Sequence, residues 1–154
     1  MKTKESLSAA TEIEANKRLV RTYTQTIFNE HHTDRASDFL SRDVKWHGGT
    51  LGTAEGVDNV AALVSGFIAA LPDLTATEKD IVAEGDTVAV RYVVEATHQG
   101  NLLGIPATGR RVRWEAVDVY RVSNGKIAEE WAADDMLAIL VALDVYTPPW
   151  LRKR

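Results

Sequence analysis

The chain contains no cysteine and no long apolar run, and its charges of opposite sign nearly balance. Without cysteine there is no disulfide framework, no thiol nucleophile and no thiolate metal site. No stretch approaches the ~20 consecutive apolar residues that a membrane-spanning helix needs, and the N-terminal residues are too polar for a secretion signal. We therefore expect a soluble, cytoplasmic protein that does not associate with membranes.

The charge pattern also disfavours nucleic-acid binding. The chain has 18 lysines and arginines against 22 aspartates and glutamates, a net charge of −4, and the basic residues are spread along the sequence. The basic cluster at residues 151–154 is too short to form a nucleic-acid surface. With 154 residues and 45% hydrophobic composition, the chain is long enough for a single domain, residues 1–154, with its own core.

Hydrophobic periodicity divides the chain into a helical part and a stranded part. Apolar residues recur every three or four positions over residues 19–28 and 57–71, which predicts two amphipathic helices. A short helix is expected from Thr33, followed by a short strand over residues 44–47. A last helix is predicted over residues 135–143.

From residue 74 onward the pattern changes to alternating strands separated by turn residues. The predicted strands are residues 74–83, 87–98, 110–122 and 126–133. This order predicts an α+β domain in which N-terminal helices pack on one face of a curved antiparallel sheet. Such a sheet forms a cone, and the open end of the cone is a hydrophobic pocket for a small molecule.

One strand carries a single carboxylate on an otherwise apolar face. Side chains alternate along a strand, so the even positions from 112 to 122 share one side of the sheet. These positions are Val112, Trp114, Ala116, Asp118, Tyr120 and Val122. Asp118 loses hydration in this setting, which disfavours its charged form. We interpret it as a pocket acid with a raised pKa; the alternative is a buried structural acid that is satisfied by Tyr120, Arg91 or a backbone amide.

The turn at Ser123-Asn124-Gly125 determines which residue faces Asp118. A two-residue type I′ turn would place Trp131 opposite Asp118. A three-residue turn would place Glu130 opposite Asp118, and we adopt this second register. Two carboxylates that close cannot both ionise cheaply in an apolar pocket, so one pKa rises toward neutrality.

Several short motifs in this order resemble the SnoaL-like polyketide cyclases, within the nuclear-transport-factor-2-like superfamily that includes ketosteroid isomerase. They are Glu84-Gly-Asp86, Thr97-His98-x-Gly100, Gly104-Ile-Pro-x-Thr-Gly109, Asn124-Gly-Lys-Ile127, Glu130-Trp131, and Asp135 before a leucine-rich helix. The resemblance implies a homodimer joined through sheet faces. It also implies chemistry without a cofactor or metal, on a hydrophobic substrate that contains rings.

The resemblance also guides the choice of site residues. In the aldol cyclases of this family, a histidine before the Gly-Lys-Ile turn works with an aspartate after it; these positions fall here on Asp118 and Ala132. The candidate catalytic residues are Asp118, Glu130 and His47. The candidate substrate-binding residues are Trp46, Trp114, Tyr120 and His98. Asp134 and Asp135 are interpreted as caps of the last helix.

Three functions fit these residues. The first is a cofactor-independent cyclase or isomerase, in which Asp118 takes a proton next to a carbonyl and Glu130 or His47 stabilises the enolate. The second is a hydroxylase of the same family that needs no cofactor. The third is a dimeric module that binds a hydrophobic ligand without turnover. In each case we expect a homodimer that buries Val117, Val119 and Trp131.

Overall fold

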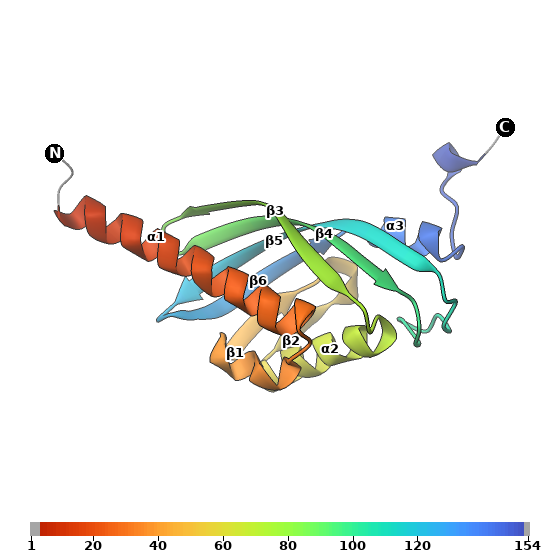
Figure 1. The fold of residues 1–154 in the computed structure, drawn as a ribbon, viewed down its shortest axis with the longest axis horizontal. Helices are drawn as coiled ribbons and strands as arrows, with labels where there is room; N and C mark the ends of the chain where they lie inside the picture. The colour runs from red at the N-terminus through yellow and green to blue at the C-terminus, as the bar shows by residue number, and fades with distance from the viewer. Residues whose placement is uncertain (1–3, 153–154) are drawn as a thin grey trace.

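A curved sheet of six strands organises the structure, a computed structural model that describes residues 4–152 (Figure 1). The strands lie in the order β2-β1-β6-β5-β4-β3. They are β1 (Leu40–His47), β2 (Thr53–Glu55), β3 (Thr75–Glu84), β4 (Thr87–Thr97), β5 (Arg111–Ser123) and β6 (Lys126–Asp134). The helices are α1 (Lys4–Tyr23), α2 (Val57–Ala70) and α3 (Met136–Ala142), and a π-helical turn, Thr24–Asn29, extends α1.

The helices and the sheet form the predicted α+β arrangement. The sheet arches over α1 and α2, which lie under its concave side (Figure 1). Helix α1 packs against β3 and β4, α2 against β1, and α3 against β5. The predicted apolar stripe of the first helix is buried, since Val20, Tyr23 and Ile27 are each 1% exposed or less. The hydrophobic core therefore lies between the helices and the concave face.

The first part of the sheet differs in detail from the sequence analysis. Strand β1 is longer than predicted and runs parallel to β6, so the sheet is mixed rather than wholly antiparallel. Strand β2 has only three residues and was not predicted. The short helix predicted from Thr33 is a 3-10 helix, Thr33–Asp38. Alternation of side chains indicates that a segment is a strand, but it carries no information on the direction of a distant neighbour.

The β5–β6 hairpin has a register that neither predicted turn produces. Asn124 and Gly125 both have positive φ angles, 51° and 72°, so the turn is the two-residue type and the adopted three-residue turn is wrong. A bulge at Ala128 then shifts the pairing by one residue, which places Ala132 opposite Asp118. The prediction of Glu130 opposite Asp118 is therefore wrong as well.

Because of the bulge, each side chain of β6 still points to the side of the sheet that the adopted register predicted. Glu130 is buried on the concave side, whereas Trp131 on the other side is 41% exposed. Without the bulge, Glu130 would point outward and Trp131 inward, because a one-residue slip moves every side chain to the other face. Within residues 4–152, no helix combines the length and the apolar character needed to span a bilayer.

Candidate functional site

An apolar cavity of about 90 Å³ lies between the helices and the concave face of the sheet. Most of its lining is aliphatic or aromatic, but it also contains three carboxylates, one from β5 and two from β6. Five predicted site residues line it: Trp46, Trp114, Asp118, Tyr120 and Glu130. The third carboxylate, Asp134, was not predicted to belong to the site.

The hairpin register sets the arrangement of the three acids. Ala132 lies directly opposite Asp118, and Glu130 and Asp134 stand two residues to either side of Ala132. Each of these two acids is therefore a diagonal neighbour of Asp118 on the same face, a spacing of ~7–8 Å. Asp118 occupies the middle of the group.

Asp118 is an acid with little hydrogen bonding. The Tyr120 hydroxyl donates to Asp118 Oδ2 over 3.3 Å, and Oδ1 is buried with no hydrogen-bond partner among the described residues. Burial and then the charge of Asp134 raise the pKa of Asp118 from 3.8 to about 7, although the Tyr120 hydrogen bond opposes the rise. An acid with a pKa near neutrality is suited to accept and return a proton.

Glu130 is the most deeply buried of the three acids, with 2% of its surface exposed. The Tyr23 hydroxyl lies 3.5 Å from Glu130 Oε2. Burial raises the pKa of Glu130 well above its ordinary value, and the charges of Asp118 and Asp134 raise it further. A raised pKa favours the protonated form of Glu130, whose O–H can donate a hydrogen bond.

Asp134 ends β6 on the pocket face and receives a hydrogen bond from Trp114. The distance from Trp114 Nε1 to Asp134 Oδ1 is 2.6 Å. Burial raises the pKa of Asp134, and the indole hydrogen bond opposes this rise. The interpretation of Asp134 as a helix cap is wrong, because Asp135 alone accepts from the amide of Ala138, over 3.0 Å. Alternation along β6 already places Asp134 on the same face as Ala132, and the register of the hairpin brings that face beside Asp118.

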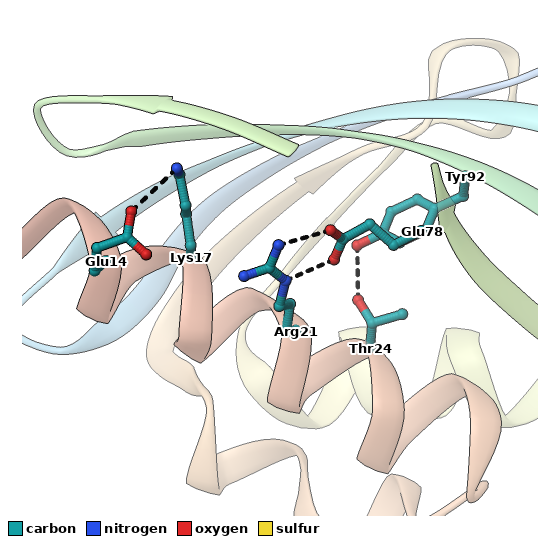
Figure 2. A network of polar contacts seen from close by, with 6 residues as sticks. All are labelled: Glu14, Lys17, Arg21, Thr24, Glu78 and Tyr92. Atoms are coloured by element: carbon teal, nitrogen blue, oxygen red, sulfur yellow. Dashed lines mark hydrogen bonds and ion pairs between the residues drawn. The ribbon is translucent and has the colours of Figure 1, made fainter. Parts of the chain in front are cut away.

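Polar contacts attach the end of α1 and the π-helical turn that follows it to the sheet beside the pocket (Figure 2). Arg21 donates to both carboxylate oxygens of Glu78 over 2.8 Å each. One turn further on, the hydroxyls of Thr24 and Tyr92 are 2.7 Å apart. These contacts position Tyr23, whose pKa is raised well above its ordinary value mainly by burial, as a hydrogen-bond donor toward Glu130. Sequence analysis missed these tyrosines.

Comparison with known proteins agrees with this geometry. The sequence profile of the SnoaL-like polyketide cyclases matches residues 17–143. The chain belongs to this family. It is 28% identical over 123 residues to the aklanonic acid methyl ester cyclase DnrD of Streptomyces peucetius, an alignment that covers 78% of this chain and 81% of DnrD.

Two solved structures illustrate the range of the SnoaL-like family. AclR of Streptomyces galilaeus, proposed to be a hydroxylase, has a TM-score of 0.77 and 31% identity, over 88% of this chain and 99% of AclR. IdmH of Streptomyces antibioticus, proposed to be a polyketide cyclase, has a TM-score of 0.73 and 29% identity, over 84% of this chain and 99% of IdmH.

The two positions that the SnoaL-like resemblance marks as catalytic face each other across the hairpin. They are Asp118 and Ala132, directly paired between β5 and β6. This chain therefore has a carboxylate at the first position and a methyl group at the second. The acids on β6 stand on either side of that methyl group.

His47 lies outside the pocket of this SnoaL-like domain. Its neighbour Trp46 points into the cavity, so His47 points to the opposite side of β1. There His47 Nε2 is 2.8 Å from Glu129 Oε1, and the imidazole stacks on Trp131 with ring centroids 5.4 Å apart. The prediction that His47 acts in the pocket is wrong for this reason.

His98 is fully buried but does not line the cavity either. Its Nδ1 accepts a hydrogen bond from the backbone amide of Thr108 over 3.3 Å and lies 2.9 Å from the Thr108 hydroxyl. His98 thus fastens the two ends of the loop between β4 and β5, and its predicted contact with substrate is wrong. No group of three or more side chains among the described residues is placed to hold a metal ion.

Proposed function

We propose that this chain is a cofactor-independent enzyme of the cyclase or isomerase type, acting on a hydrophobic, ketone-bearing molecule. The observation that carries the proposal is Asp118, an acid with a pKa of about 7 at the centre of an apolar cavity. Near neutral pH such a carboxylate is partly ionised and poorly hydrated, which suits a general base.

In this mechanism Asp118 acts as the ionised base, and Glu130 acts as a protonated hydrogen-bond donor. The Asp118 carboxylate removes a proton from a carbon next to a carbonyl group, and the electron pair moves to the carbonyl oxygen as an enolate. The protonated Glu130 donates a hydrogen bond to that oxygen, which stabilises the developing charge. In cyclisation the enolate carbon then attacks a second carbonyl, and the oxygen of that carbonyl takes the proton from Asp118. In isomerisation Asp118 returns the proton at another carbon.

The cavity is too small to admit a polycyclic substrate without movement of its lining. About 90 Å³ is below the ~300 Å³ at which small-molecule pockets usually begin. A polycyclic ligand must therefore displace side chains of the lining. Leu63 and Phe67 of α2 are only partly buried and line the cavity, so we expect α2 to shift outward on binding.

The test is a screen of aromatic polyketides and conjugated ketones, followed by substitution of Asp118. Asp118→Asn keeps the volume but cannot accept a proton, so turnover should fall by ~10²–10⁴. Glu130→Gln retains a hydrogen-bond donor and should have a smaller effect. Glu115→Gln is a matched control, because Glu115 lies on the same strand but faces outward and is exposed. Full activity in Asp118→Asn would refute the assignment.

One observation favours a second candidate, the non-catalytic binding module. Ala132 stands where the family resemblance places the cyclase aspartate, so part of the usual machinery is missing. If the screen finds no turnover while hydrophobic ligands still bind tightly to the wild type, this second function should replace the first. Oxygenated products would instead favour the hydroxylase activity proposed for AclR.

A further inference from the structure

Asp134 is the pocket carboxylate to which the proposed mechanism gives no role. It is the only one of the three acids with a short hydrogen bond, 2.6 Å from the indole N–H of Trp114. A hydrogen bond from a fixed donor stabilises the ionised form of a carboxylate. The tyrosine hydroxyls that donate to Asp118 and Glu130 are farther from these acids, at 3.3 and 3.5 Å. This hydrogen bond opposes the rise that burial causes in the pKa of Asp134, so Asp134 is the acid of this group best supported as an anion.

Asp134 lies close enough to Asp118 for its charge to affect the ionisation of Asp118. The two residues are diagonal neighbours on one face of the hairpin, and both line the same apolar cavity. An anion at this spacing opposes a second negative charge, and the low dielectric of the cavity strengthens the effect. Ala132 lies between them and has no polar atom in its side chain.

We propose that Asp134, held by the short hydrogen bond from Trp114, is a positioning residue whose negative charge favours the protonated form of Asp118. In the proposed function, on which this inference rests for its catalytic meaning, Asp134 would adjust the strength of the base without touching the reacting atoms. The Trp114–Asp134 pair would thereby supply the negative charge that Ala132, at the position of the family's aspartate, lacks.

The other groups that face Asp118 do not supply this charge. Titratable side chains reach it from β5 (Tyr120), from β4 (Tyr92), from β6 (Glu130) and from α1 (Tyr23). The pKa values of the three tyrosines are raised, first of all by burial, so they remain neutral over the relevant range. Burial likewise favours the protonated, neutral form of Glu130. Helix α3 has no ionisable side chain.

The experiment measures the ionisation of Asp118 in two matched variants. Asp134→Asn removes the charge but keeps the volume and an oxygen that accepts from Trp114. Glu130→Gln makes the same chemical change on the same strand and face, at the other diagonal neighbour of Asp118. Carbon-13 NMR of the labelled Asp118 carboxyl, followed over about pH 4 to 9, reports its titration directly.

We expect Asp134→Asn to increase the ionisation constant of Asp118 on the order of tenfold, and Glu130→Gln to leave it unchanged. Trp114→Phe, which removes the indole donor, should raise the pKa of Asp134 and lower that of Asp118. This variant also carries the test if Asp134→Asn does not fold. An unchanged Asp118 titration in Asp134→Asn would overturn the inference, and so would an equal change in Glu130→Gln.

The NMR result is independent of the proposed function, because it needs no substrate. If no turnover is found but Asp134→Asn still changes the Asp118 titration, the enzyme proposal fails and this inference stands. If a substrate is found, the low-pH limb of its rate profile should move to lower pH in Asp134→Asn. A residue that merely holds Trp114 in place would not move that limb, because the amide keeps the hydrogen bond.

Discussion

Replacing Asp118 by asparagine should make the folded protein more stable at neutral and alkaline pH. The folded chain holds the pKa of this acid at about 7, against an ordinary value of 3.8. Between these two values the folded state keeps a proton that the unfolded state has released, so stability falls as pH rises. Asparagine cannot ionise, so the variant does not lose this stability.

The size of the effect follows from the pKa difference. Each pKa unit corresponds to 1.36 kcal/mol, so a difference of about three units gives an advantage of about 4 kcal/mol to Asp118→Asn above pH 7. This is an upper bound, because the amide also needs hydrogen-bond partners in an apolar site. At pH values below about 4 the acid is protonated in both states, and the advantage should vanish.

Urea unfolding of wild type and variant at about pH 4 and pH 8 measures this difference directly. The expected result is a midpoint difference that is small at the lower pH and large at the higher one, with unchanged slope m. Glu115→Gln, on the outer face of the same strand, should show no comparable change. A stability difference that does not vary with pH would refute the argument, because it would mean that Asp118 has an ordinary pKa.

Three further predictions concern packing, assembly and catalysis. Gly100→Ala should destabilise the fold by about 1–3 kcal/mol in urea unfolding, since the new Cβ would lie 2.8 Å from the backbone oxygen of Ala69. Val117→Lys should convert the proposed homodimer to monomer in sedimentation experiments, because Val117 and Trp131 are large exposed apolar residues on one face. The kcat/KM of any substrate found should rise with pH through about 7, since Asp118 accepts a proton only when ionised.

Each of these predictions has a control and a contrary outcome. Gly66→Ala in α2 has open space around the new Cβ and should instead stabilise the fold by ~1 kcal/mol. Destabilisation by both glycine variants would contradict the steric argument. Val82→Lys changes an exposed valine on β3 and should not affect assembly; a monomeric wild type at micromolar concentration would contradict the interface. Activity that falls as pH rises through 7 would exclude Asp118 as the base.

The pocket face of β5 was predictable from the sequence because it depends only on the chain itself. Side chains alternate along any regular strand, so Trp114, Asp118 and Tyr120 had to share a face. The apolar neighbours of Asp118 indicated which face was buried. The positive φ angles at Asn124 and Gly125 likewise follow from the preference of these residue types for the left-handed conformation.

The pairing between segments was decided by tertiary structure. The bulge at Ala128 has no local signature, yet it determines that Ala132 rather than Glu130 or Trp131 faces Asp118. Sequence alternation showed that either Trp46 or His47 would line the pocket, and the packing of β1 against β6 selected Trp46.

For Asp134, too, the sequence determined one part of the outcome and tertiary structure the other. Asp134 ends β6 and Asp135 follows it, and aspartate is a residue type that favours a helix cap. Only one of them can be in the cap position, and the register of β6 turned the other toward Trp114. The sequence by itself therefore determined the fold class, the turn residues and the face that carries Asp118. Tertiary structure determined which acids surround it, because register and burial depend on contacts between residues far apart in the chain.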